Sequence, residues 1–299
     1  IPQLHSPMSD RTRGVLFVLA AAVLWSSGGL LIKLITLNPA ASPVARGLAI
    51  AGGRSVVAAL VIWAFARPTS FRFTRGQFLG ALTYAGTVIF FVIATRMTTA
   101  ANAILLQYTA PIYAALLSYR MLREPITRFD WLSILSVFVG MALFFLNDLG
   151  GGGMTGDVLA VISGVFFALC VVLLRKERHG SPLGIVLLGN IITVVIGLPF
   201  MIGNAPSGTD ILLLLPLGAL QLGLGYICFV RGVRHVSAIE GTLIPVLEPI
   251  LNPIWVVLFY GEHPTTNAVI GGLIVIATVT ARGIHKAVHE RNNDRPTGG

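Results

Sequence analysis

One apolar stretch of the chain, GTLIPVLEPILNPIW at residues 241–255, contains three prolines, a glutamate and an asparagine. The prolines are spaced four residues apart, so they share one helix face, and each removes a backbone hydrogen bond. Glu248 and Asn252, also four apart, lie on the neighbouring stripe. In a bilayer, freed carbonyls and a charge are tolerated only beside protein partners or a wet cavity. The stretch therefore predicts a bent helix that lines an internal polar cavity.

A second charge, Arg54, lies at the middle of another apolar run, residues 44–65. A charged side chain at the centre of a bilayer costs roughly 2.5–3.5 kcal/mol on insertion scales, and pairing with an opposite charge lowers that cost. Two interpretations of Glu248 follow, and the sequence leaves both open. In the first it forms a structural ion pair with Arg54, and in the second it contacts a substrate.

Aromatic side chains are also expected at mid-depth. Trp25 lies in the middle of its apolar run, in AVLWSSGG, and the same holds for Tyr84 and Tyr108. An amphipathic ring at that depth requires a hydrogen-bond partner or a cavity, which favours a pocket for an aromatic or apolar substrate side chain; ordinary packing between helices is the alternative. The predicted substrate ligands are Trp25, Ser26, Tyr84, Tyr108, Phe167, Glu248 and Asn252.

The sequence offers little for catalysis or for metal binding. The six histidines fall in predicted loops or tails, and the two cysteines, Cys170 and Cys228, lie singly within apolar runs. A phosphate-cradling GxxxxGK[ST] motif is absent. We therefore expect a protein that is not an enzyme and that uses neither a metal nor another cofactor.

The elements that position these residues follow from composition. Of 299 residues, 55% are hydrophobic and only 11% are charged, with a mean hydropathy of +0.83, whereas soluble domains have about 25% charged residues. A helix needs roughly 20 mostly apolar residues to span a bilayer. Ten runs qualify or nearly do: 14–36, 44–65, 77–96, 100–119, 131–147, 157–174, 182–203, 209–231, 237–260 and 266–285. The sequence predicts an all-α membrane protein with ten transmembrane helices.

The basic residues indicate how these helices are oriented. The net charge of +9 is spread over short gaps between apolar runs and forms no basic stripe, so a nucleic-acid partner is not expected. If both termini are cytoplasmic, all but four of the 21 Lys and Arg residues fall on the cytoplasmic side, as the positive-inside rule requires. We expect a plasma-membrane protein, in the bacterial inner membrane, with cytoplasmic tails at 1–13 and 287–299. The segment IPQLHSP before Met8 is expected to be a cloning remnant.

An internal duplication is visible in the order of the residues. The glycine run at 149–153 separates five predicted spans from five more, residues 14–147 from 154–286. Because each half has an odd number of spans, the second half is predicted to be inverted, which is typical of secondary transporters with a central site. Three pairs share an offset of 138 residues: Arg96 with Arg234, Pro111 with Pro249, and Glu124 with Glu262.

These features together resemble a known family. Arg54 in the second run, Pro111 in the fourth, Leu247-Glu248-Pro249 in the ninth and Gly261-Glu262 at its end are similar to the EamA family of the drug/metabolite transporter superfamily. The resemblance covers nearly the whole chain and is greatest to YddG-type exporters of aromatic amino acids. It implies a helical bundle around a central cavity and the export of small metabolites.

The functional hypothesis is therefore a secondary transporter that exports aromatic or other apolar amino acids by alternating access, and that works as a monomer in the lipid bilayer. The alternative is a proton-coupled exporter of drug-like organic cations, in which Glu248 carries the proton. At the start of the ninth run, near its cytoplasmic end, Glu240 is expected to face water. Structural or gating roles are predicted for Arg54, Pro111, Glu124, Pro249 and Glu262.

Overall fold

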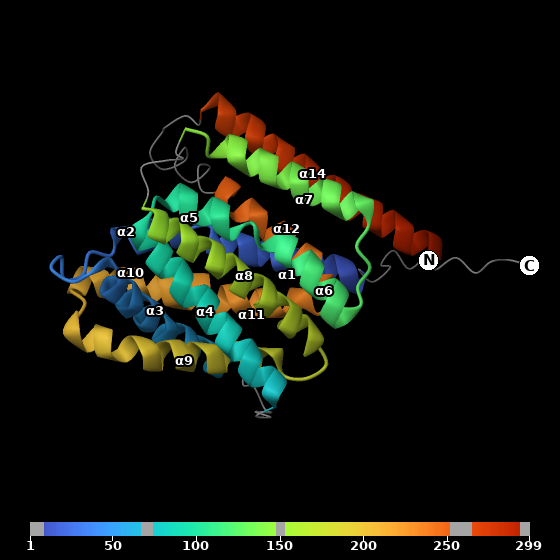
Figure 1. Ribbon diagram of the computed structural model, residues 1–299. Helices are drawn as coiled ribbons and strands as arrows, with labels where there is room; N and C mark the ends of the chain where they lie inside the picture. Colours follow the sequence, from blue (N-terminus) through green and yellow to red (C-terminus); the bar gives the residue numbers. More distant parts are fainter. Residues whose placement is uncertain (1–8, 67–73, 148–152, 252–264, 294–299) are drawn as a thin grey trace, which may run out of the picture.

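The computed structural model describes residues 9–66, 74–147, 153–251 and 265–293, and within these ranges the regular structure is helical, with no strand. The long helices form one bundle (Figure 1). Helix α1 (Asp10–Trp25) begins and helix α14 (Thr266–Asn293) ends at the same end of this bundle, on the right in Figure 1. We call this the tail end, and the opposite end the far end.

Between α1 and α14 the chain forms a regular succession of helices, several of which are broken within one predicted span. They are α2 (Gly28–Leu34), α3 (Pro43–Ala66), α4 (Arg75–Met97), α5 (Ala100–Gln107), α6 (Ala110–Leu122), α7 (Arg128–Phe144), α8 (Met154–Lys176), α9 (Pro182–Gly203), α10 (Gly208–Pro216), the π-helix η1 (Leu217–Leu224), α11 (Gly225–Val233), α12 (Ala238–Leu243) and the 3₁₀ turn η2 (Ile244–Val246).

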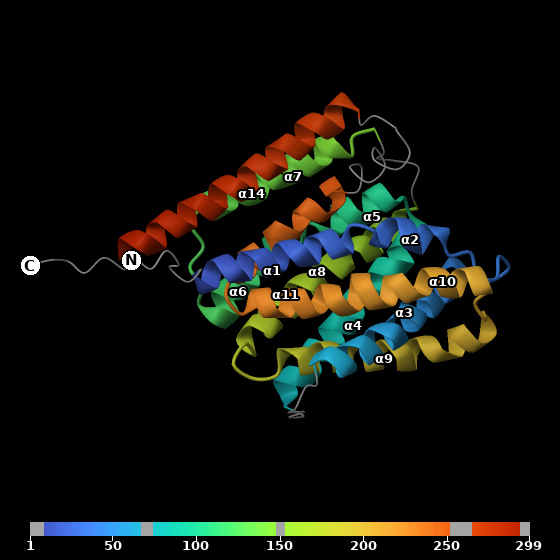
Figure 2. The same ribbon diagram turned by 180° about the vertical axis from the view of Figure 1, so that it is seen from behind.

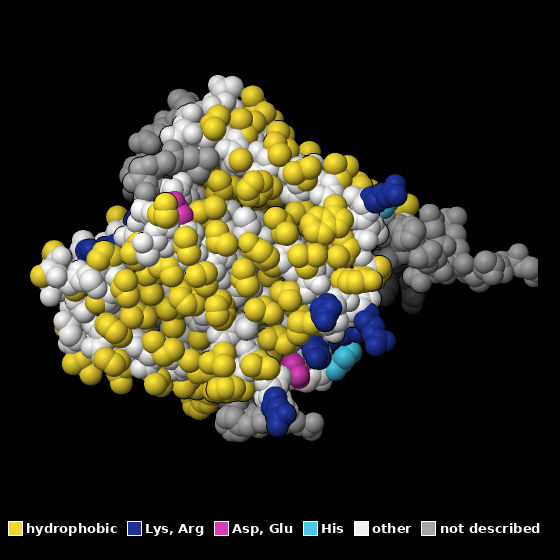
Figure 3. All heavy atoms as spheres, viewed as in Figure 1, with side chains coloured by type: hydrophobic (Ala, Val, Ile, Leu, Met, Phe, Trp, Pro, Cys, Tyr) yellow, Lys and Arg dark blue, Asp and Glu magenta, His cyan; other side chains and the backbone are white. Residues whose placement is uncertain are grey.

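Eight helical segments within the described residues are long and apolar enough to cross a membrane. The fifth predicted span corresponds to α7, which has 17 residues, and the ninth is described only as far as residue 251. Large apolar side chains such as Leu60, Trp63 and Phe65 point outward, and hydrophobic atoms dominate the face shown in Figure 3. Helices of this length with such an outer surface define an integral membrane protein.

The predicted break in the ninth span is present, and the fourth span has a matching one. Helix α5 ends at Gln107 and α6 resumes at Ala110, while α12 gives way to the 3₁₀ turn Ile244–Val246. Thr99 and Ser237, which begin these spans as N-caps, are 138 residues apart, as are Pro111 and Pro249 just after the breaks. Each of these two prolines therefore lies in the first turn after a break, where a helix requires no N–H.

Helices α7 and α14 pack along each other on one side of the bundle in both views (Figures 1 and 2). Glycines allow this close approach. A Cβ atom at Gly140 would lie 3.0 Å from the carbonyl oxygen of Gly271, and one at Gly271 would collide with the backbone of Phe144. The contact is made backbone to backbone, as small residues permit in membrane bundles.

Candidate substrate cavity

A cavity of about 50 Å³ lies inside the bundle, where the two broken spans meet the other helices. Four of the predicted substrate ligands line it: Trp25, Tyr108, Phe167 and Glu248. Its other lining residues are Arg54, Thr87, Val88, Phe91, Gln107, Gln221, Leu222 and Tyr226.

Tyr108 connects the two helix breaks. It caps the end of α5, and its hydroxyl oxygen lies 2.7 Å from the carbonyl oxygen of Pro245 and 2.6 Å from Oε2 of Glu248. In a continuous helix the Pro245 carbonyl would accept the N–H of residue 249, but Pro249 has none. A tyrosine hydroxyl donates only one proton, so both contacts are hydrogen bonds at once only when Glu248 carries a proton and donates it to the tyrosine.

Arg54 is 2% exposed and faces the same cavity. Its Nη1 lies 3.4 Å from Oε1 of Gln221 and its Nη2 lies 3.5 Å from the carbonyl oxygen of Val88, and both distances are long for hydrogen bonds. Its Nε has no partner among the described residues. Arg54 and Glu248 are not joined by an ion pair; Glu248 is held by Tyr108 instead. The structural pair, one of the two interpretations of Glu248, is therefore not formed, and the buried guanidinium of Arg54 faces the cavity with no anion paired to it among the described residues.

Aromatic rings form one wall of the cavity. The indole of Trp25 contacts Tyr226 at 4.9 Å, Phe229 at 5.0 Å and Phe167 at 6.2 Å between ring centroids. Gly225 lets the indole approach α11, because a Cβ atom there would lie 2.7 Å from Cδ1 of Trp25. The indole Nε1 has no hydrogen-bond partner among the described residues. The wall thus combines apolar ring surface with one available N–H donor.

Two predicted ligands lie away from the cavity. Tyr84 is fully buried; its hydroxyl accepts a hydrogen bond of 2.9 Å from Nδ2 of Asn190, and its ring packs edge-on against Tyr226. Ser26 donates its hydroxyl proton to the carbonyl of Val23 at 2.6 Å. Neither lines the cavity. The hydroxyl of Tyr84 is used in a contact between helices and that of Ser26 in a contact within its own helical turn, and substrate contact by either residue stays a prediction. Asn252 and Glu262 lie outside the described residues.

Sequence reasoning missed several polar lining residues. Gln107 donates from Nε2 to the Ser163 hydroxyl at 2.8 Å, and that hydroxyl donates to the Thr87 carbonyl at 3.0 Å. Gln221 lies in the π-helical segment opposite Arg54. The available signal was an amide at the middle of an apolar run, which is costly in lipid unless it faces an interior. No group of three His, Cys, Asp or Glu residues in the described part of the chain could hold a metal ion.

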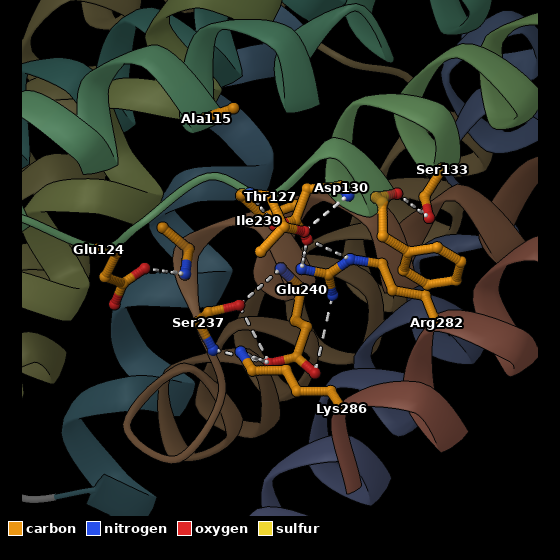
Figure 4. Close-up of polar contacts among 12 residues, drawn as sticks. Ala115, Glu124, Thr127, Asp130, Ser133, Ser237, Ile239, Glu240, Arg282 and Lys286 are labelled. Atoms are coloured by element: carbon orange, nitrogen blue, oxygen red, sulfur yellow. Dashed lines mark hydrogen bonds and ion pairs between the residues drawn. The ribbon is translucent and has the colours of Figure 1, made fainter. Parts of the chain in front are cut away.

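At the tail end, Glu240 is the centre of an ion-pair cluster (Figure 4). It is 3% exposed, and its carboxylate oxygens lie 2.6 Å from Arg11, 3.0 Å from Lys286 and 3.7 Å from Arg282. Arg282 also pairs with Asp130 at 2.7 Å. The expectation that Glu240 faces water was wrong, because α1 and α14 bring three cations around the start of α12. We call these five side chains the charged clasp.

A second acidic group holds the same helix start. Glu124 accepts a hydrogen bond of 2.8 Å from Nε of Arg175 and one of 3.1 Å from the backbone N–H of Ala238, the first residue of α12. Figure 4 shows Glu124 beside this turn. A carboxylate at a helix N-terminus satisfies a backbone donor and complements the helix dipole. Glu124 thus fixes α12 to α8 at the tail end.

At the far end, side chains of Asn102 and Thr98 hold the start of the fourth span to Asp157, and Nζ of Lys33 donates to the carbonyl of Thr98 at 3.0 Å. Nδ2 of Asn102 lies 3.2 Å from Oδ1 of Asp157 and 3.3 Å from the Thr98 hydroxyl, which donates to the same carboxylate oxygen at 2.6 Å. Asp157 belongs to the first turn of α8. We call the side chains of Asn102, Thr98 and Asp157 the neutral clasp.

The fold, the cavity and the duplicated breaks define a membrane transporter. The model of the EamA-like transporter family matches residues 12–146 and again residues 154–281. The chain belongs to the EamA-like transporter family.

Individual relatives are distant and carry different names. The chain is 27% identical over 199 residues to an uncharacterized transporter of Clostridium kluyveri, covering 61% of this chain and 63% of that protein. It is 29% identical to the threonine/homoserine exporter RhtA of Salmonella typhimurium, covering 75% and 77% of the two chains. A solved crystal structure matches with a TM-score of 0.73 at 18% identity, covering 89% of this chain and 96% of the other, which shows the shared fold.

Proposed function

We propose that the protein exports amino acids across a membrane, with a preference for aromatic and other apolar side chains. The observation that carries this proposal is one cavity bordered by a buried cation, Arg54, and a partly buried carboxyl group, Glu248, that are not paired with each other. An amino acid zwitterion supplies the opposite charge to each. The carboxylate would bind Arg54, and the ammonium group would bind Glu248.

The remaining donors of the cavity fit the same ligand. A carboxylate has two oxygens and accepts several hydrogen bonds, and the unpartnered Nε atoms of Arg54 and Trp25 are both donors. The rings of Trp25, Phe167 and Tyr226 would then face the side chain of the amino acid. At about 50 Å³ the cavity does not hold a large side chain as it stands, so these rings must part when an aromatic substrate enters.

Glu248 would also couple the substrate to protons. In the empty cavity its contact with Tyr108 is fully satisfied when the carboxyl is protonated, and it must be ionised to receive an ammonium group. Proton and amino acid would therefore compete for one carboxyl group. That competition gives an exchange of external protons for internal amino acid, without a nucleotide-hydrolysing site.

The membrane arrangement belongs to the proposal as well. The tail end would lie in the cytoplasm, in a plasma membrane, and the two halves would be inverted repeats that exchange shapes around the cavity. The family matches the two halves separately, and one relative is named as an exporter of threonine and homoserine, which are amino acids. Both facts support an amino acid carrier, and the preference for aromatic over hydroxylated side chains rests on the ring wall alone.

Transport by purified protein in liposomes tests the proposal. Labelled phenylalanine, labelled threonine and a labelled organic cation would each be offered with and without a pH gradient. We expect phenylalanine flux that rises with the gradient and is blocked by excess tryptophan. If threonine is transported and phenylalanine is not, the amino acid proposal is retained and the aromatic preference is rejected. If no amino acid is transported under any gradient, the proposal of amino acid export is refuted.

A proton-coupled exporter of drug-like cations is the second candidate, supported by Glu248 as a carboxyl group on the cavity. Arg54 counts against it, because a cation in the same small cavity would meet an unneutralised guanidinium. Cation transport that requires the proton gradient, together with no transport of amino acids, would favour this candidate.

A further inference from the structure

A second cavity, of about 360 Å³, lies apart from the central one, between α1, the α12–η2 segment and α14. We propose that this crevice binds one anionic phospholipid, with an acyl chain between the helices and the phosphate at the charged clasp. The proposal is independent of which substrate the transporter carries.

The walls of the crevice are apolar along most of their length. Val15 and Leu19 line it from α1, Leu243 and Leu247 from the broken ninth span, and Val279 from α14. Figure 2 shows α1 and α14 on the two sides of this region. These helices are membrane-spanning segments, so the medium that meets the crevice from outside is lipid hydrocarbon. An unfilled apolar crevice in that medium would be occupied by an acyl chain.

The depth of the crevice matches one leaflet. Its lining on α1 runs from Arg11 to Leu19, a separation of eight positions along the helix, which is about 12 Å at a rise of 1.5 Å per residue. Half of the hydrocarbon core of a bilayer is about 15 Å thick. The charged side chains are therefore at headgroup level when the apolar walls are at acyl-chain level, which is the arrangement of a phospholipid standing in its own leaflet.

Charge selects the headgroup. Three members of the charged clasp, Arg11, Glu240 and Arg282, line the crevice. Lys286 and Asp130 complete the clasp through their ion pairs with Glu240 and Arg282. Among these five described side chains the cations outnumber the carboxylates by one. The side chain of Lys286 is 33% exposed and remains accessible to a phosphate while it contacts Glu240. Basic residues at a membrane surface favour anionic lipids in this way.

Native mass spectrometry of the full chain, purified in mild detergent and supplied with phosphatidylglycerol or phosphatidylcholine, tests the proposal. We expect one phosphatidylglycerol per chain and clearly weaker retention of phosphatidylcholine. Leu19→Trp fills the crevice and should lower retention by about tenfold. Leu16→Trp is the matched control, because Leu16 is 48% exposed, is on the same helix and does not line the crevice; it should retain the lipid.

A headgroup variant keeps the proposal testable if Leu19→Trp fails to fold. Lys286→Ala should weaken phosphatidylglycerol binding by about fivefold and leave phosphatidylcholine unchanged. Lys176→Ala, an exposed lysine at the end of α8, should change neither. Equal retention of both lipids by the unaltered chain, or equal effects of the crevice variants and their controls, would overturn the proposal.

Discussion

The two broken spans of the protein are built alike but are fastened differently. Both begin with a hydroxyl N-cap, and both break just before a proline, at positions 138 residues apart. Three residues after the cap, the fourth span has Asn102 and the ninth has Glu240. Asn102 belongs to the neutral clasp at the far end, whereas Glu240 is the centre of the charged clasp at the tail end.

Because of this difference, the two ends of the bundle are held by interactions of unequal strength. Alternating access requires each end to open in turn around a fixed site. Opening the tail end would separate Glu240 from three cations, while opening the far end would break hydrogen bonds among Asn102, Thr98 and Asp157. Charges in a buried ion-pair cluster are costly to separate, because each is then left without a partner in a medium of low dielectric constant. We infer that the tail end is the harder one to open and that its opening depends on salt.

Removal of the charge at Glu240 should have the largest effect on stability. Within the charged clasp, Glu240→Gln leaves Asp130 as the remaining carboxylate beside three cations, and breaking a buried pair in this way costs about 3 kcal/mol. Thermal unfolding in detergent at low and high salt measures this loss of stability and its dependence on salt. Asp10→Asn, which removes an exposed carboxylate at the same end, should cost less than about 1 kcal/mol. Equal losses for the two variants would remove the basis of the comparison.

Tyr108→Phe should have the second-largest effect on stability. It removes the hydroxyl through which the break in the fourth span contacts the break in the ninth. The Pro245 carbonyl loses its donor and Glu248 loses the hydroxyl that it contacts, and a buried group left unsatisfied costs about 1–3 kcal/mol. We expect a lower melting temperature and slower amino acid flux. Tyr119→Phe is the control, because Tyr119 is 64% exposed and its change should be silent. Unchanged flux in Tyr108→Phe would show that the breaks work independently.

The neutral clasp should matter less than the charged one. Asn102→Ala removes two hydrogen bonds to Asp157 and Thr98, which corresponds to about 1 kcal/mol each at most. Because Asn102 is uncharged, the loss should be nearly the same at low and high salt. A salt-dependent loss as large as that of Glu240→Gln would contradict the proposed asymmetry.

Pro249→Ala should have the smallest effect on stability and a larger one on transport. The alanine N–H would compete with Tyr108 for the Pro245 carbonyl and would extend helix through the break. We expect normal expression, a melting temperature near that of the unaltered chain, and reduced flux. Pro111→Ala tests the matched position in the fourth span. Transport that is unaffected in both variants would exclude the breaks as moving parts.

Much of the fold was predictable because lipid imposes simple rules on sequence. The long apolar runs predicted the helices, and the proline spacing predicted the break in the ninth span. The cavity was only partly predictable. Position along the apolar runs predicted that Glu248 and Trp25 lie at mid-depth, where the cavity is found. Depth does not tell which side of a helix faces the cavity, and Tyr84 lies beside it, hydrogen-bonded to Asn190. Glu240 was missed because its partners come from α1 and α14, far away in sequence.

The central claim is that Arg54 and Glu248 together bind a zwitterion. Competition against labelled phenylalanine uptake in proteoliposomes tests it most directly, with phenylalanine methyl ester, which lacks the carboxylate, and N-acetylphenylalanine, which lacks the ammonium group. The account predicts that unlabelled phenylalanine competes and that each analogue competes at least about tenfold less well, as expected for the loss of a charge-assisted contact. Equal competition by all three compounds would contradict it.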